Sequence, residues 1–479
     1  MAMKAYIATT VLAALASSIE AQIPDPIPAD PAKSQLGLVV KEIASFPKSE
    51  PVPAPSDPRL MRRARINHLG EIPDGSRRRY VPDLNGTLYV LQADAPRVYL
   101  DVKTAVGANF FSGRGLGSGF GFVAFHPEFK NNGKFYTVHT EAFGTLTTNA
   151  LDLTPQPKTI VHGVVSEWTA HNPRASAFAG TRRELLRLGF ASYVHGIQQI
   201  DFNLTASPGD EDYALLYIAV GDGAMGVSTD DPQNLGLPQG KILRIDPSGT
   251  NSANGKYGIP AANPFVGKAN ALGEIFAYGM RDPHRFSWDP AGTHRMLLAH
   301  IGEKHIESIY DVHAGDNLGW SEREGPFVYN KADRCDLYAV PQDDAKYGYT
   351  YPVAAYDHNP PPGLPCGTDV GHAISGGFVY RGSAMRDLRG KYVFADLVDG
   401  RVMSAEEREM RRGQALATIH ELAIFDDSGS EVTMPILVGD ARVDLRLGRD
   451  GDGELYLLSK ANGKIWKVVG TRAVVRADR

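Results

Sequence analysis

The sequence predicts an all-β fold, a six-bladed β-propeller built from four-stranded antiparallel blades. The 50 glycines and 32 prolines among 479 residues indicate many turns, as expected of short strands joined by loops. A turn followed by a short run of aromatic and β-branched residues recurs six times along the chain. A β-sandwich would also give short strands with turns, but six similar copies favour radial repetition.

The repeated pattern is an acidic, Asn or Gly turn that precedes a strand-forming run. The copies lie at 83–90, 131–138, 212–219, 292–299, 390–395 and 452–458. We expect each copy to lead into an inner strand of one blade, with loop insertions of different size between copies. Short helical patterns are expected only from Arg182 to Leu188 and from Ala405 to Arg412.

The N-terminus predicts export. Residues 1–22 resemble a signal peptide, because Lys4 precedes an apolar run that is too short to span a bilayer. An apolar first helix is the alternative, but the prolines between 24 and 31 would interrupt it. The Pro-rich residues 23–57 are expected to be a linker, and residues 58–472 the propeller. The mature protein is therefore expected to be secreted or periplasmic, with no membrane span.

Composition excludes some classes of partner. Hydrophobic residues make up 43% of the chain and charged residues 22%, which allows a sizeable core. The formal net charge is -5 and both signs are mixed along the chain, so no nucleic-acid partner is expected. The two cysteines, Cys335 and Cys366, are expected to form a disulfide in an oxidising compartment. Two buried free thiols are the alternative.

The first residue with a pattern typical of catalysis is His195. It lies just before the strand-like run Ile197 to Phe202, at a junction from which a side chain can reach the axis of a propeller. An imidazole changes charge near neutral pH, which suits a general base that takes a proton from a hydroxyl group. The alternative is a structural histidine bonded to the neighbouring backbone.

Two arginines, Arg281 and Arg285, bracket a Pro-containing turn. A guanidinium group binds carboxylates through two parallel hydrogen bonds, so this turn predicts a ligand that carries carboxylates. Alternatively, the two arginines pair with nearby aspartates and hold the turn.

Two acidic, Gly-containing loops are candidates for cation binding. Asp222 lies between two glycines, where it would ligate a cation or bond backbone amides in a turn, and the turn is favoured. The loop of Gly302, Glu303 and Glu307 offers carbonyl oxygens to Ca²⁺, although it lacks EF-hand spacing.

These motifs occur in an order that resembles a known family. The motifs lie at 125–129, 195, 221–223, 240–247, 259–265, 279–285, 317–320, 375–382 and 390–396. Together they resemble the soluble, quinone-dependent sugar dehydrogenases of the glucose/sorbosone dehydrogenase family over roughly residues 60–470.

The resemblance implies pyrroloquinoline quinone (PQQ) held by arginines at the propeller centre, with Ca²⁺ polarising the quinone. It implies that His195 is the catalytic base and that Arg281 lies beside the cofactor. Asp282 stands where an Asn is common. Gly302 and Glu303 fall in the loop that supplies main-chain oxygens to the ion.

Several positions depart from the pattern of this family. Leu318 replaces a usual Tyr, and Val398 stands where some members carry a cofactor-binding Lys. The paired arginines found late in the family have no clear counterpart, and Arg442 or Arg446 is expected to replace them. The segment from Gly115 to Phe122 lacks a glutamine found in glucose-oxidising members.

The resulting hypothesis is an exported dehydrogenase that oxidises an aldose or related sugar at C1 and passes electrons to a separate acceptor. No Cys-x-x-Cys-His motif for haem attachment occurs. One alternative is a binding propeller similar to hedgehog-interacting proteins, which recognises a protein or glycan. Another, less favoured, is a metal-dependent lactone or ester hydrolase. An enzyme requires His195, Arg281 and at least one more cation to face one central pocket.

Overall fold

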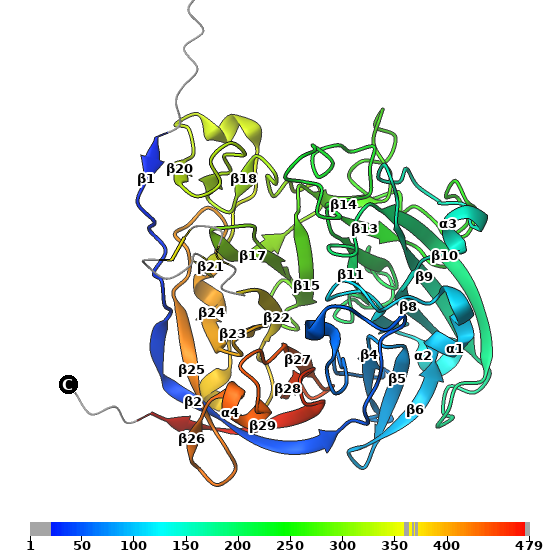
Figure 1. The fold of residues 1–479 in the computed structure, drawn as a ribbon, viewed down its shortest axis with the longest axis horizontal. Coiled ribbons are helices and arrows are strands. Elements are labelled where there is room, and N and C mark those ends of the chain that lie inside the picture. The colour runs from blue at the N-terminus through cyan, green and yellow to red at the C-terminus, as the bar shows by residue number, and fades with distance from the viewer. Residues whose placement is uncertain (1–20, 359–363, 366–367, 369–371, 475–479) are drawn as a thin grey trace, which may run out of the picture.

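The structure, a computed structural model, describes residues 21–358, 364–365, 368 and 372–474. Its strands form sheets with mainly antiparallel pairing, most of them four-stranded, arranged radially around a common centre (Figure 1). The predicted all-β propeller with four-stranded antiparallel blades is confirmed.

Four sheets of the ring contain four strands each. The first holds β3 (Gly70–Glu71), β4 (Arg79–Asp83), β5 (Thr87–Gln92) and β6 (Ala95–Asp101). The second holds β7 (Phe120–Phe125), β8 (Lys134–Glu141), β9 (Val161–Ala170) and β10 (Gly180–Phe190). The third holds β11 (Ile197–Phe202), β12 (Leu216–Val220), β13 (Lys241–Ile245) and β14 (Ile275–Tyr278). The fourth holds β15 (Asp282–Trp288), β16 (Met296–Ile301), β17 (Ile306–Val312) and β21 (Ala354–Asp357).

The remaining part of the ring is a nine-stranded sheet made of two four-stranded units. One unit holds β22 (Ile374–Val379), β23 (Lys391–Asp396), β24 (Val402–Glu406) and β25 (Ile419–Phe425), and β26 (Glu431–Val432) pairs with β25. The other holds β27 (Leu445–Arg449), β28 (Leu455–Ser459), β29 (Lys464–Ala473) and β2 (Ala32–Ser45). Because these two units share one continuous sheet, the six-blade count stays a prediction.

The N-terminal strand β2 closes the ring. It pairs antiparallel with β29 near the C-terminus and parallel with β25 of the preceding unit. The expectation that residues 23–57 form a linker is therefore wrong for residues 32–45, which form a strand of the ring. The prolines lie on either side of β2, where they do not interrupt its hydrogen bonds.

Elements outside the ring are few. A small sheet holds β1 (Gln22–Ile23), β18 (Arg323–Glu324), β19 (Phe327–Val328) and β20 (Leu337–Ala339). The α-helices are α1 (Val102–Val106), α2 (Phe129–Asn132), α3 (Thr145–Thr148) and α4 (Met434–Val438). The five 3₁₀ turns are η1 (Pro58–Leu60), η2 (Gly107–Asn109), η3 (Asp344–Tyr347), η4 (Arg386–Leu388) and η5 (Glu407–Glu409).

The two predicted helical patterns are largely wrong. The segment from Arg182 to Leu188 lies in β10, where pairing with β9 overrides its local preference for helix. The segment from Ala405 to Arg412 contains only the end of β24 and the single turn η5.

The six repeated turns each fall in a different four-stranded unit. Five of them lead into the second strand of the unit, namely β8, β12, β16, β23 and β28. The copy at 83–90 leads into β5, the third strand of its sheet. The runs therefore form inner strands of their sheets, and the innermost strand of each unit precedes the turn.

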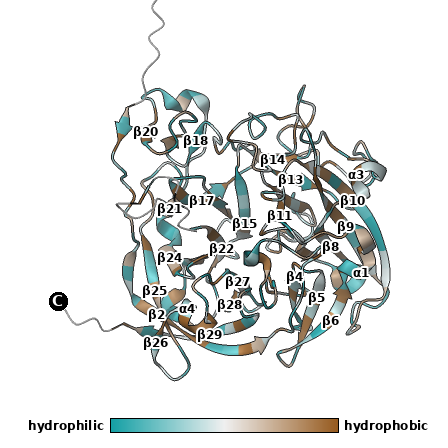
Figure 2. Ribbon diagram, in the orientation of Figure 1, coloured by the Kyte–Doolittle hydropathy of each residue, from teal (hydrophilic) through white to brown (hydrophobic). Residues whose placement is uncertain are grey.

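The hydrophobic core runs around the ring between the faces of neighbouring sheets. Tyr80 and Leu88 of the first sheet pack with Phe125 and Trp168 of the second, and similar clusters join each following pair. Figure 2 shows hydrophobic residues along the strands and hydrophilic residues on the outer strand β10. Because both faces of a sheet are covered, central strands such as β12 are buried at every residue.

The innermost strands surround the centre of the molecule. From β7 through β11, β15 and β22 to β27 each contacts the next, β27 contacts β3, and β4 of the first sheet contacts β7 to complete the ring. A parallel bridge between Leu69 and Gly448 forms part of the contact between β27 and β3. Loops at the ends of these strands therefore converge on one axis.

Two expectations fall partly outside the described residues. The predicted signal peptide lies almost wholly outside them, and so does Cys366, so export and the disulfide stay predictions. Among the described residues, no helix combines the length and apolarity needed to cross a membrane.

Truncating Leu38 in β2 tests whether this strand is part of the core. Leu38 is fully buried between the two units of the large sheet, so Leu38→Ala is expected to lower the free energy of unfolding by about 2–5 kcal/mol. Urea denaturation would measure it. Lys41→Ala, at an exposed position of the same strand, should change stability by no more than about 0.5 kcal/mol. Equal effects of the two substitutions would contradict the closure by β2.

Candidate functional site

A cavity of about 610 Å³ lies where the loops converge. Its wall includes all seven residues predicted from the sequence for catalysis, cofactor or metal binding. These are His195, Arg281, Asp282, Gly302, Glu303, Arg442 and Arg446. The fold thus gathers residues that lie up to 251 positions apart in the sequence, the separation of His195 and Arg446.

His195 is held by a buried carboxylate. Its Nδ1 lies 2.8 Å from Oδ1 of Asp222. Its side chain lines the cavity and is 14% exposed. The backbone of His195 has a φ of 53°, in the left-handed region that non-glycine residues rarely adopt. A Cβ atom at Gly221 would lie 2.5 Å from the His195 carbonyl oxygen, so only glycine lets the two loops approach.

Asp222 is fixed by four donors. Besides His195, it accepts hydrogen bonds from the amides of Ala224 and Gly226 and from Nε1 of Trp320. Burial is the largest single effect and opposes ionisation, but the hydrogen bonds from His195 and Trp320 together with the charges of His195 and Arg281 outweigh it, and the pKa of Asp222 is lowered. The turn predicted from the sequence is present. The bond to His195 was missed, although the Gly-Asp-Gly run directly after β12 was the available signal.

Asp282 lies on the other side of His195. Its Oδ2 is 4.0 Å from Nε2 of His195, and its buried Oδ1 has no hydrogen-bond partner among the described residues. Burial raises the pKa of this carboxyl group, against the attraction of His195 and Arg281. An unpartnered buried oxygen at the cavity wall is a group that a ligand can satisfy.

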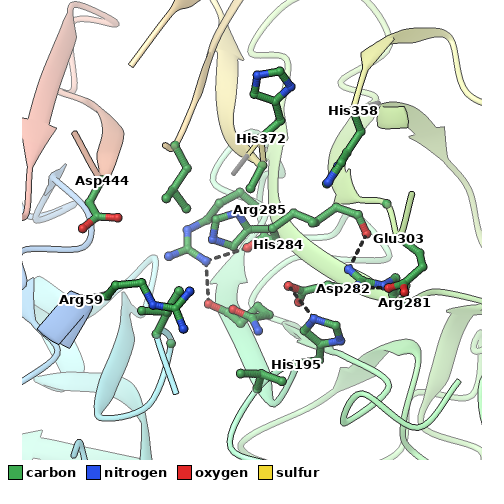
Figure 3. Close-up of a pocket in the computed structure, with 18 of the residues that line it drawn as sticks. Arg59, His195, Arg281, Asp282, His284, Arg285, Glu303, His358, His372 and Asp444 are labelled. Carbon is green, nitrogen blue, oxygen red and sulfur yellow. Dashed lines mark hydrogen bonds and ion pairs between the residues drawn. The ribbon is translucent and has the colours of Figure 1, made fainter. Parts of the chain in front are cut away.

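Arg281 and Glu303 form an ion pair in the cavity wall. Nη2 of Arg281 lies 2.5 Å from Oε2 of Glu303, as the dashed line in Figure 3 shows. The loop that carries Gly302 and Glu303 is held by Glu324, whose Oε1 accepts hydrogen bonds from three successive amides. The carboxylate of Glu303 is therefore engaged by Arg281.

The two late arginines have different surroundings. Nε of Arg442 is 2.9 Å from Oδ1 of Asp444, which also pairs with Arg62. Arg446 donates to Oδ1 of Asn67 and to a backbone carbonyl, and it forms no ion pair with a described carboxylate. Arg446 is thus the arginine whose charge stays unbalanced.

Three further buried cations share this property with Arg446. Sequence reasoning named Arg285 as a candidate ligand of carboxylates, but it assigned no role to Arg65 and Lys460. Arg65, Arg285 and Lys460 line the same cavity, and each is at most 8% exposed. The two arginines donate to neutral acceptors such as the carbonyl oxygens of Ser112 and Gln198. None of the four cations forms an ion pair with a described carboxylate.

The unbalanced charge affects the titration of these groups. Burial and the neighbouring Arg446 lower the pKa of Arg285 to about 9, and burial lowers the pKa of Arg65 to about 10. Burial and the charges of Arg446 and Arg65 hold the pKa of Lys460 well below its usual range. This part of the cavity therefore carries positive potential that an anionic ligand would relieve.

A second histidine–carboxylate pair was also missed. Nδ1 of His358 lies 2.5 Å from Oε1 of Glu307, which is fully buried and also accepts from the amide of Ile374. Figure 3 shows His358 directed toward the cavity, opposite His195. Sequence spacing carries no signal for this pair, because 51 residues separate its members.

The arrangement combines two chemical abilities. An imidazole with a carboxylate on one nitrogen can accept a proton at the other nitrogen. A cluster of buried cations can hold a ligand with several negative charges beside it. Among the described residues, no group of three or more His, Cys, Asp or Glu side chains is placed to hold a metal ion.

Comparisons with known proteins agree with this geometry. A family model described as Glucose / Sorbosone dehydrogenase matches residues 69–467. The HIPL2 protein of Arabidopsis thaliana is 27% identical over 446 residues, covering 83% of this chain and 60% of its own length. The human Hedgehog-interacting protein is 26% identical over 411 residues, covering 83% and 50%. The chain thus spans 50–60% of the length of these two relatives.

One solved structure has a similar fold and a bound cofactor. The PQQ-bound aldose sugar dehydrogenase of Streptomyces coelicolor superposes with a TM-score of 0.55 at 16% identity. The match covers 93% of this chain and all of that one. At this identity the likeness concerns the fold.

Replacing Asp222 tests the support of His195 through pH. The lowered pKa means that folding favours the ionised carboxylate, which adds stability above the unfolded-chain pKa of about 3.9. This stability is lost as pH falls through the lower native value. Asp222→Asn is therefore expected to cost about 1–3 kcal/mol at pH 7, with a difference that shrinks below about pH 4. Chemical denaturation across pH would measure it.

Asp427→Asn, at an exposed loop position, is the matched control and should leave stability unchanged at every pH. A cost for Asp222→Asn that does not depend on pH would show that the charge of Asp222 contributes nothing.

Proposed function

The chain belongs to the Glucose / Sorbosone dehydrogenase family, and from this premise we propose that it oxidises an aldose or related sugar at C1 with PQQ as cofactor. The supporting observation is the cavity that joins the His195–Asp222 pair to four buried, unbalanced cations. A base alone would suit many reactions. Its position beside an anion site is what a dehydrogenase with a carboxylate-bearing cofactor requires.

The residues fit PQQ, which carries several carboxylates. Arg65, Arg285, Arg446 and Lys460 are the groups that would hold these carboxylates, because none of them forms an ion pair with a carboxylate of the described residues. Lys460 would take the place of the cofactor-binding lysine that the sequence lacks at Val398. Arg281 and Asp282 would lie at the edge of the cofactor nearest His195, and Arg442 would stay with Asp444.

The side chains do not fit Ca²⁺ by themselves. This ion prefers six to eight oxygen ligands, and the carboxylate of Glu303 is engaged by Arg281. An ion at Gly302 and Glu303 would depend on main-chain oxygens and on the cofactor. Calcium binding at this loop stays a prediction, and we assign no chemical step to it.

When bound, the quinone would accept the two electrons of the sugar as a hydride from C1. His195 would take the proton of the C1 hydroxyl group at Nε2, because Nδ1 is occupied by Asp222. The carboxylate of Asp222 would stabilise the imidazolium that forms. The buried, unpartnered Oδ1 of Asp282 would form a hydrogen bond with the ligand.

Electrons would leave the reduced cofactor to a separate acceptor, since the chain has no haem-attachment motif. The proposed location is secreted or periplasmic, in keeping with the N-terminal segment. The sugar would be bound in the part of the cavity between His195 and His358 (Figure 3).

The second candidate function is binding of a protein or glycan without catalysis. It is favoured by the relatives named Hedgehog-interacting protein and HIPL2, which match 83% of this chain. The two functions differ in what they require of the cavity. A binding propeller does not need a carboxylate-supported histidine beside buried cations, and their presence favours the dehydrogenase.

Titration with PQQ followed by sugars tests the proposal. The purified protein is expected to bind PQQ, with Ca²⁺ present, in a 1:1 ratio and to show bleaching of the quinone absorbance with an aldose. His195→Ala should retain cofactor binding but slow bleaching by about 10²–10⁴-fold, because only the base is lost. His313→Ala, whose side chain is 59% exposed away from the cavity, is the control. Absence of binding at micromolar PQQ would reject the dehydrogenase and favour the binding propeller.

Replacing Lys460 tests the anion site. Removing a buried amine with a depressed pKa should raise the free energy of unfolding of the cofactor-free protein, because folding no longer has to desolvate or deprotonate it. The same change, Lys460→Met, should weaken PQQ binding by about 10- to 100-fold through loss of a charged hydrogen bond. Thermal denaturation and absorbance titration would measure the two effects.

The exposed Lys48→Met is the matched control and should alter neither quantity. If Lys460→Met lowers stability and leaves PQQ affinity unchanged, Lys460 serves packing and the proposed anion site is wrong.

A further inference from the structure

A second, smaller cavity of about 60 Å³ lies on the axis of the propeller. It is lined mainly by residues of five innermost strands, β7, β11, β15, β22 and β27. Arg285 and Arg446 line both this chamber and the larger cavity. At roughly 30 Å³ for each water-sized group, the chamber holds about two such groups and is too small for a sugar.

The chamber carries more positive than negative charge. Arg285, Arg446 and Arg449 line it, and none forms an ion pair with a described carboxylate. Asp201 is its single acidic lining residue, and burial raises the pKa of this carboxyl group to about 7. Asp201 is therefore partly protonated near neutral pH and balances less than one of the three guanidinium charges.

Two polar groups in the chamber have no partner. Oγ of Ser375, a residue that is 3% exposed, has no hydrogen-bond partner among the described residues, and neither has the buried Nη1 of Arg449. The guanidinium of Arg449 stacks on the ring of Phe378 at 4.9 Å, which leaves its N–H edge available. A buried donor without a partner costs free energy, so a bound group is expected here.

His68 reports the same excess of positive charge. Burial and the charges of Arg285 and Arg449 lower its pKa to about 3, so the imidazole is neutral. The ring lines the chamber but adds no further charge at physiological pH. A positive ligand is thereby disfavoured, and a neutral one would leave the charge unbalanced.

We propose that this axial chamber binds a small monovalent inorganic anion, with chloride as the ordinary occupant. Arg449 and Ser375 donate to it directly, and Arg285 and Arg446 supply positive potential from the side of the larger cavity. The chamber shares Arg285 and Arg446 with the proposed cofactor site, but an anion bound to Arg449 and Ser375 takes no part in the proposed oxidation of the sugar. It would stabilise the centre of the ring, where β11, β15, β22 and β27 meet.

Thermal denaturation of the full chain tests the proposal. Sodium chloride replaces sodium gluconate stepwise at constant ionic strength. The wild-type Tm is expected to rise by about 2 °C and to saturate with chloride. Arg449→Met should raise the chloride-free Tm, because an unpaired buried charge is removed, and should abolish the chloride response. Ser375→Ala should shift the midpoint of the response to higher chloride.

Arg408→Met, at a side chain that is 75% exposed, is the control and should keep the full response. A bromide-soaked crystal should show anomalous density in the chamber. If the Tm is identical in chloride and gluconate, the chamber holds water only. If the chloride response persists in both Arg449→Met and Ser375→Ala, the anion binds elsewhere. Either result overturns the proposal. Should Arg449→Met fail to fold, Ser375→Ala and the bromide density decide.

Discussion

The pairing of β2 with β29 is the constraint on which the rest of the molecule depends. Each sheet buries both faces against its neighbours, so an open ring would expose a hydrophobic face at each end. β2 joins the start of the chain to its end and also bonds to β25 of the preceding unit. Closure at this one place holds all the innermost strands around the axis.

The closed ring explains how the central cavity holds so much unbalanced charge. Arg65, Arg285, Arg446 and Lys460 come from four separate segments of the chain, and each guanidinium or ammonium group is turned toward the axis. Repulsion among them is unfavourable, and the folded ring tolerates it because the hydrophobic interfaces between sheets are extensive. The strained backbone of His195 depends on the same support, through Gly221 and the bonds of Asp222.

The site could be predicted from the sequence only in part. His195 and Arg281 lie in short motifs next to strands, and a side chain at the end of an innermost strand of a propeller lies near the axis. Lys460 and Arg65 carry no such motif. Lys460 follows β28, a second strand, and only the turn after it brings the amine inward. The chamber around Arg449 is likewise invisible in the sequence, since its residues come from five strands.

The sequence by itself determined the fold class, the repetition and the place of His195 beside a strand, because turns and short strands are encoded locally. It misjudged β2 and β10, because these strands are defined by pairing with other strands and not by local sequence. Only the tertiary structure decided which cations remain without a counter-charge, since this depends on the carboxylates that the ring brings near. That balance of charge, more than any single motif, defines what the centre of this protein can bind.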